Sequence, residues 1–203
     1  MRKVCLILAI LLSSALVFAG TAIKLDTQGL VDRSAWVIEG RVLSARVIAG
    51  PTGRPETEYC VSVDVPYWGG PEGLRVFRFP GGVLPDGSGM VVPGLPVLRA
   101  GEEVILFLTG ESSAGWRMPV GLSQAKYRRL RDARGQDVVV REHGDLKLLD
   151  AGTGQVEPAP AEDVKPYAEL RAEIEAAVKL RLEREAEAER EGRLGEPERR
   201  GAR

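Results

Sequence analysis

Hydrophobic and polar positions alternate along several stretches of the chain, which is the pattern that β-strands show. The alternation is strictest over residues 59–65, where Tyr or Val occupies every second position. Residues 35–48 and 74–79 are rich in aliphatic and aromatic side chains, and turns containing Gly and Pro separate them from that stretch. The three stretches predict consecutive antiparallel strands, and Gly40 inside the first of them predicts a bulge or a bend.

Further strands and one short helix are predicted around these three. Residues 102–109 begin with two glutamates and continue with the apolar run VILFLT, which favours a buried strand. Residues 115–120 predict a short strand, and residues 126–130 and 138–141 predict a hairpin across an Arg-Gly turn. Residues 26–34 begin with Asp and Thr, which are good helix N-caps, and they predict a short helix or turn.

Residues 80–101 follow neither pattern, because these 22 residues contain six Gly and four Pro. A loop of this length in a compact domain is usually a binding element or a mobile segment. A flap that covers one end of a barrel is the alternative interpretation. Two tryptophans beside glycines could supply a neighbouring aromatic platform, although core anchoring is the favoured interpretation in a chain with few aromatic residues. The candidate binding residues are Trp68, Gly81, Gly82, Met90, Pro93, Gly94 and Trp116.

The chain changes character after the last predicted strand, so residues 23–149 are predicted to form one β domain. Residues 150–162 have the composition of a linker. Residues 163–190 are predicted to form an amphipathic helix capped by Asp163, because apolar residues recur at every third or fourth position. Glu and Arg dominate beyond this apolar stripe, and residues 191–203 are predicted to be a disordered charged tail.

The first residues carry the features of an export signal. Two basic residues precede an apolar run that extends to Phe18, and the small residue Ala19 ends the segment. This arrangement predicts a signal peptide over residues 1–19, with cleavage after Ala22 as the alternative. The run is shorter than the stretch of about 20 apolar residues that spans a bilayer. The mature protein is therefore expected to be secreted or periplasmic, without membrane insertion.

Composition and charge exclude several function classes. Hydrophobic residues make up 44% of the chain and charged residues 28%, which is typical of a globular protein. Lys and Arg total 28 against 29 Asp and Glu, so a nucleic-acid partner is not expected. The chain has one His and two Cys, which are too few for most zinc sites, and it has no phosphate-binding glycine motif. We therefore predict no metal site and no cofactor.

Removal of the signal peptide would also remove Cys5, so Cys60 would be the one cysteine of the mature chain. Its position within an alternating strand favours a small, half-apolar residue on that strand. An intermolecular disulfide or a reactive thiol is the alternative.

Residues 121–125, Gly-Leu-Ser-Gln-Ala, are one residue short of the G-x-S-x-G turn that exposes a nucleophilic serine. The final Gly of that motif is replaced by Ala, and strand-like rather than helical sequence follows. The one histidine that could act as a base is His143, which lies in a polar sequence and is expected to be exposed. A hydrolase using Ser123 and His143 is therefore an alternative, and the leading prediction is a protein without catalytic residues.

The succession of motifs resembles a group of uncharacterised exported bacterial proteins. These motifs are AWVIEGRV at 35–42, the valine-alternating strand, PGG at 80–82, PG at 93–94, GEE at 101–103 with LFL at 106–108, and VGLSQ at 120–124. More distantly, the strand order over about residues 30–142 resembles the oligonucleotide/oligosaccharide-binding barrel of netrin-like domains and tissue inhibitors of metalloproteinases. The resemblance implies that fold. The N-terminal zinc-binding cysteine and the disulfides of those inhibitors have no counterpart here, so inhibition is not expected.

These features predict a mainly β protein, with a small antiparallel β-barrel followed by a C-terminal amphipathic α-helix. The leading function is a non-catalytic binding or interaction module of the cell envelope, with an envelope protein or peptide as its partner. The alternatives are the hydrolase and a structural or assembly protein that acts through its C-terminal helix. Nothing in the sequence specifies an oligomeric state.

Overall fold

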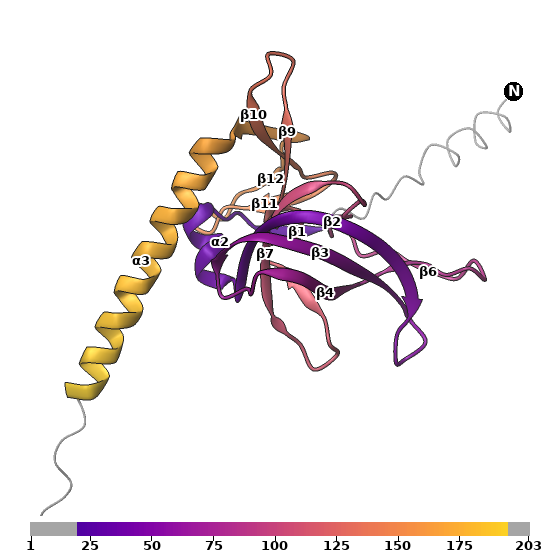
Figure 1. Ribbon diagram of the computed structural model, residues 1–203, viewed down its shortest axis with the longest axis horizontal. Coiled ribbons are helices and arrows are strands. Elements are labelled where there is room, and N and C mark those ends of the chain that lie inside the picture. Colours follow the sequence, from indigo (N-terminus) through magenta and orange to yellow (C-terminus); the bar gives the residue numbers. More distant parts are fainter. Residues whose placement is uncertain (1–19, 195–203) are drawn as a thin grey trace, which may run out of the picture.

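The computed structural model describes residues 20–194 and has a mainly β body with a long C-terminal helix (Figure 1). The predicted mainly β class with antiparallel sheets and a C-terminal helix is confirmed. The predicted signal peptide, residues 1–19, lies outside the described residues, and so does the end of the predicted tail, residues 195–203. No helix in the described part of the chain combines the length and apolar character needed to cross a bilayer.

Most strands belong to one curved antiparallel sheet with the order β13-β10-β9-β7-β2-β3-β4. The short strand β8 also belongs to this sheet and pairs with β7. Its strands are β2 (Trp36–Ala49), β3 (Pro55–Trp68), β4 (Gly73–Pro80), β7 (Glu103–Glu111), β8 (Arg117–Pro119), β9 (Lys126–Arg131), β10 (Asp137–Glu142) and β13 (Glu162–Pro166). Among residues 20–194, β4 and β13 do not pair with each other, so hydrogen bonds do not close the sheet into a barrel. The bulge predicted at Gly40 is confirmed by a shift in the register of β2 against β3.

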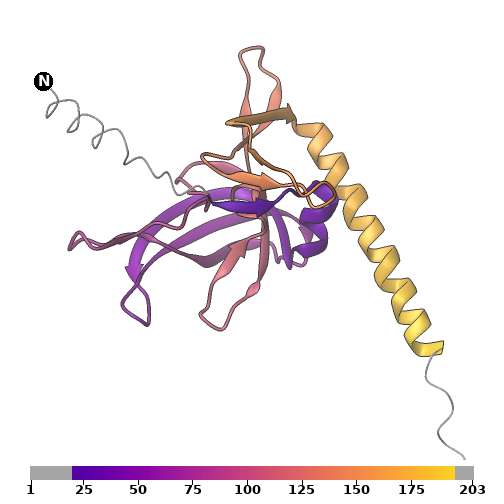
Figure 2. The same cartoon turned by 180° about the vertical axis from the view of Figure 1, so that it is seen from behind.

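Two small sheets and three helical segments complete the described fold. The strands β1 (Thr21–Ile23), β11 (Lys147–Leu149) and β12 (Val156–Pro158) form one sheet, and β5 (Gly82–Val83) pairs with β6 (Gly89–Met90). The helical segments are α2 (Thr27–Arg33), the 3-10 turn η1 (Leu122–Ala125) and α3 (Tyr167–Leu194). Figure 2 shows from behind that the β5–β6 hairpin and α3 lie at opposite ends of the molecule.

The linker predicted over residues 150–162 is wrong in part. This segment contains β12 and the first residue of β13, and these strands pair with β11 and β10. Helix α3 begins at Tyr167, so the cap predicted at Asp163 is also wrong. Asp163 lies in β13, where its carboxylate pairs with Arg141 at 2.7 Å. The β structure therefore extends to Pro166 rather than ending near residue 149.

Strand β7 is buried on both faces and separates two hydrophobic cores. Val104, Leu106 and Leu108 point to one face, whereas Ile105 and Phe107 point to the other, as alternation along a strand requires. The sheet core consists of Ile38, Val42, Tyr59, Val61, Val63, Phe77, Phe79, Leu98, Val104, Leu106 and Leu108. We call the sheet face that carries these residues the inner face.

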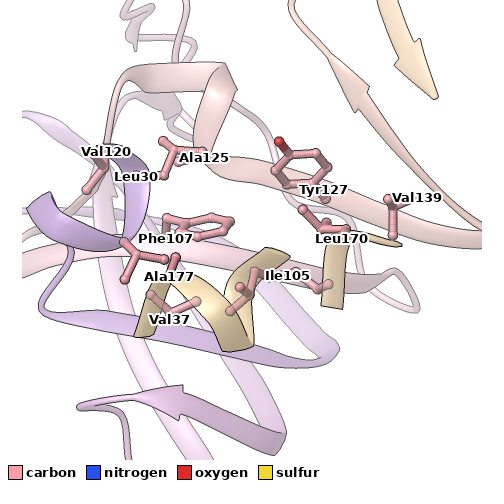
Figure 3. Close-up of a cluster of buried hydrophobic side chains, with 12 residues drawn as sticks. Leu30, Val37, Ile105, Phe107, Val120, Ala125, Tyr127, Val139, Leu170 and Ala177 are labelled. Carbon is pink, nitrogen blue, oxygen red and sulfur yellow. The ribbon is translucent and has the colours of Figure 1, made fainter. Parts of the chain in front are cut away.

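The second core joins α2 and α3 to the opposite face of β7 (Figure 3). The helix core consists of Leu30, Val31, Val37, Ile105, Phe107, Val120, Ala125, Tyr127, Val139, Leu170, Ile174 and Ala177. Leu170 and Ile174 of α3 are fully buried in it. The apolar stripe predicted for this helix therefore packs against the β body. Residues 182–191 of α3 extend beyond this contact and are exposed.

Polar contacts fix α3 at both ends of its docked part. The hydroxyl group of Tyr167 donates a hydrogen bond to the carboxylate of Glu39 at 2.7 Å. Farther along the helix, the Arg181 guanidinium donates to the backbone carbonyl oxygens of Val31 and Ser34, both at 2.7 Å. These carbonyls lie at the C-terminal end of α2, where the last carbonyl groups of a helix lack their usual partners, and the Val31 carbonyl also accepts from the Ser34 N–H at 3.1 Å. Arg181 therefore caps α2 while it holds α3 in place.

Candidate functional site

Residues 90–98, which we call the roof segment, cover part of the inner face. The ammonium group of Lys126 donates to the backbone carbonyl oxygen of Val97 at 2.7 Å and pairs with the Glu102 carboxylate at 2.8 Å. That carboxylate also accepts a hydrogen bond from the backbone N–H of Arg99 at 3.0 Å. Burial alone would raise the pKa of Glu102, but Lys126 and the Arg99 N–H hold it below its usual value. Glu102 is therefore ionised at neutral pH and fixes the end of the roof segment.

An apolar cavity of about 350 Å³ lies between the roof segment and the inner face. Its walls come from the ends of β2, β3 and β4, from the β5–β6 hairpin and from the roof segment. The lining residues are Ala45, Val47, Thr57, Tyr59, Phe79, Pro80, Gly81, Gly82, Val83, Met90, Val91, Val92, Leu95, Pro96, Val97 and Leu98. Gly82 has a φ of 129°, and a Cβ atom there would lie 2.7 Å from the Val47 side chain, so this close approach requires glycine.

The lining of the apolar cavity contains two polar side chains, Thr57 and Tyr59. Thr57 Oγ1 donates to the backbone carbonyl oxygen of Gly81 at 2.7 Å, and Tyr59 is 3% exposed. Burial raises the pKa of Tyr59, so its phenol is neutral at physiological pH. No charged side chain is among these lining residues, so a charged group brought into the cavity would lose its water without gaining an oppositely charged partner, which is unfavourable. The cavity therefore suits an apolar group.

Three valine side chains that line the apolar cavity are also exposed to solvent. The exposed fractions are 63% for Val83, 86% for Val91 and 61% for Val97. Exposed aliphatic side chains scattered singly are normal, whereas a cluster of them often marks an interaction site. The opening of this cavity is such a cluster.

A second cavity, of about 420 Å³, lies on the other side of the roof segment and has several polar walls. Ser123, Lys126 and His143 line it, together with charged residues of β9 and β10. The roof residues Val91, Val92, Leu95, Pro96 and Val97 border both cavities. The roof segment is thus a partition between an apolar and a polar cavity.

The structure places five of the predicted binding residues at these two cavities. Gly81, Gly82 and Met90 line the apolar cavity, and Pro93 and Gly94 line the polar cavity. The sequence does not predict the inner-face wall, to which β2, β3 and β4 contribute aliphatic and aromatic residues. Strict alternation in β3 shows which of its residues share a face, but no local signal indicates that the roof segment folds back over that face.

The two predicted tryptophans line neither of these cavities. Trp68 lies at the end of β3 and packs against the helix core, with the Arg181 guanidinium 4.2 Å from its ring centroid. Trp116 lies in the turn between β7 and β8, where its backbone N–H donates to Ser112 Oγ at 3.1 Å. The predicted aromatic platform is therefore not part of the cavity walls.

Ser123 and His143 lie close together, and both are buried, with exposed fractions of 4% and 2%. The prediction that His143 is exposed is therefore wrong. Ser123 Oγ donates to the backbone carbonyl oxygen of His143 at 3.3 Å rather than to the imidazole ring. Burial, followed by the nearby Arg141 cation, lowers the pKa of His143 to about 4.

Replacing Ser123 with Ala tests the hydrolase alternative. We expect Ser123→Ala to fold normally and to lose about 1 kcal/mol of unfolding free energy, because one long hydrogen bond is removed. Urea unfolding measures the loss, and hydrolysis of p-nitrophenyl acetate measures esterase activity. An activity that is present in the natural chain and disappears in this variant would support the hydrolase instead.

Cys60 is half-buried on β3 and forms no disulfide with another described residue. It stands opposite Ser44 on β2 and Val76 on β4. Among residues 20–194, no group of three or more His, Cys, Asp or Glu side chains is placed to hold a metal ion.

Comparisons with protein-family models, with curated proteins and with solved structures find no match for this chain. The resemblance to exported bacterial proteins and to netrin-like domains therefore stays a prediction from the sequence.

Proposed function

We propose that this chain is an exported, non-catalytic binding module of the cell envelope, and that the apolar cavity under the roof segment receives an apolar group of its ligand. The observation that supports the proposal is the combination of an open apolar cavity with three exposed valines that line it. Covering one valine side chain contributes about 1 to 2 kcal/mol. Contact with all three, together with filling of the cavity, would give useful affinity.

The position of the cavity also supports this proposal. Residues of the β5–β6 hairpin line the cavity, and this hairpin lies at the opposite end of the molecule from α3 (Figure 2). A partner can therefore reach the cavity without displacing the helix that completes the helix core. The pair between Lys126 and Glu102 fixes the roof segment beforehand, which reduces the entropy lost on binding.

A charge placed at the cavity opening should weaken binding of a neutral apolar probe. We expect Val97→Asp to bind N-phenyl-1-naphthylamine at least about tenfold more weakly than the natural chain, because the carboxylate must lose water as the probe enters. Titration followed by probe fluorescence measures this affinity. Unfolding curves of each variant show whether the fold is intact.

Val76→Asp is the matched control for this experiment. Val76 is 58% exposed, close to the 61% of Val97, but it lies on the outer face of β4 and lines neither cavity. We expect it to bind the probe as the natural chain does. Equal losses in both variants, or no binding by the natural chain, would contradict the proposed site.

A further inference from the structure

The imidazole of His143 is buried, and no group among residues 20–194 forms a hydrogen bond with it. His143 is the one histidine in the chain, and 2% of its surface is exposed. Within the described part of the chain, both ring nitrogens are shielded from solvent and neither has a hydrogen-bond partner. Buried polar side chains in proteins are nearly always hydrogen-bonded, so this arrangement is unusual. The imidazole ring stays buried only while it is neutral, because a buried imidazolium without a partner is strongly unfavourable.

The backbone of the same residue joins four segments of the chain. The N–H of His143, just after β10, donates to the carbonyl oxygen of Ala161, which precedes β13, at 3.3 Å. Its carbonyl oxygen accepts from Ser123 Oγ in η1 at 3.3 Å and from the N–H of Leu146 at 3.2 Å. Moving the ring out of its site would therefore disturb β10, η1 and the approach to β13 together.

This junction lies under the roof segment. A Cβ atom on Gly94 would lie 3.0 Å from the side chains of both Leu122 and Leu146, so the roof packs directly on residues of η1 and of the turn after His143. His143 itself lines the polar cavity that the roof segment borders. The roof therefore rests on the segments that the His143 backbone holds together.

Two charged groups act directly on the imidazole ring. Arg141, on β10, disfavours a second positive charge, and Asp163, on β13, favours it. These two residues are paired with each other at 2.7 Å, so the carboxylate is not free to neutralise an imidazolium. The other charged residues that line the polar cavity around His143 are Arg99, Lys126, Arg128, Glu142 and Asp145.

We propose that His143 makes the roof segment labile in acid, so that the apolar cavity binds its ligand at neutral pH and releases it as the pH falls. This inference rests on the proposed function. Burial and Arg141 lower the pKa of His143 to about 4, whereas an exposed imidazole has a pKa near 6.5. In the closed form the roof segment is in place and the imidazole is buried, and in the opened form the roof segment has moved away and the imidazole is exposed. Between these two pKa values the opened form binds more protons than the closed form, so acid favours opening. The ratio of closed to opened molecules then falls by up to about 300-fold.

The test compares the natural chain with His143→Leu, in which no imidazole can become charged. Between about pH 7.5 and about pH 4.5, we expect the affinity of the natural chain for N-phenyl-1-naphthylamine to fall by more than about twofold, and by no more than the about 80-fold fall in the ratio of closed to opened molecules over this range. The variant should change less than about twofold. His143→Gln, which is also uncharged, serves if the leucine variant does not fold. Equal losses in the natural chain and the variant, or no loss in the natural chain, would overturn the proposal.

Two measurements without the probe keep this test separate from the proposed function. The imidazole signals in a proton NMR titration belong to His143 alone, and they should titrate well below pH 6; titration near 6.5 would overturn the proposal. Amide hydrogen exchange of the roof segment should become faster in acid, after correction for the intrinsic rate, in the natural chain and not in the variant. If the natural chain fails to bind the probe at neutral pH, the proposed function fails while these measurements still test His143.

Discussion

Ile174→Asp should destabilise the protein by about 4 kcal/mol or more and prevent cooperative folding under ordinary conditions. Ile174 is fully buried in the helix core, where α3 packs against β7 and α2. A carboxylate there has no cationic partner in the core and would have to be buried unpaired or force α3 away. Circular dichroism and urea unfolding measure the result. A single unfolding transition at the natural midpoint would contradict the assignment of α3 to the core.

Leu182→Asp is the matched control on the same helix. Leu182 lies two turns after Ile174 and is 52% exposed, so we expect its substitution to change the unfolding free energy by less than about 0.5 kcal/mol. Truncation of the chain after Glu162 should resemble Ile174→Asp, because it removes α3 and all of β13 except its first residue. A stable truncated chain would instead favour a helix that is free to act in assembly with a partner.

Gly40→Ala should cost about 3 kcal/mol, the second largest effect that we expect. Gly40 lies in β2 at the bulge where the register against β3 shifts. A Cβ atom at this position would lie 2.0 Å from the backbone carbonyl oxygen of Ser62 and 2.9 Å from the Cα atom of Val63. Because these are backbone atoms of the neighbouring strand, β2 and β3 would have to separate. Urea unfolding measures the cost.

Gly110→Ala provides the comparison for this substitution. Gly110 lies in β7, and the nearest atom to a Cβ atom there is the Cβ of Ala35 at 4.0 Å, which is an ordinary contact. We expect Gly110→Ala to be neutral or slightly stabilising, because alanine loses less conformational freedom than glycine on folding. Equal effects of the two substitutions would show that the close approach of β3 to Gly40 is not tight.

The strands that were predicted from the sequence are those whose own residues alternate between apolar and polar or form an apolar run. The alternation over residues 59–65 and the apolar run in β7 depend on burial on one or both faces, and both segments are strands. β12 and β13 were missed because they consist mainly of charged residues and Pro and are exposed or half-exposed. They form strands because β10 and β11 supply the partners for their backbone hydrogen bonds. The residue pattern within β12 and β13 does not indicate this pairing.

The candidate site was predicted only in part for the same reason. The glycine and proline content of residues 80–101 correctly indicated an irregular segment, and the five binding residues predicted within it line the two cavities. The exposure of His143 was predicted wrongly because its neighbours Glu142, Gly144 and Asp145 are polar or small. Its burial comes from segments around Ser123 and Ala161, which are distant in sequence.

The most direct test of the proposed binding site is a methyl NMR titration of the protein with N-phenyl-1-naphthylamine at neutral pH. We predict that the methyl signals of Val47, Val83 and Val91 shift, because these side chains line the apolar cavity. The signals of Leu74 and Val76, on the outer face of β4, should stay unchanged. Shifts confined to the outer face or to α3, with the cavity methyl signals unmoved, would contradict the account.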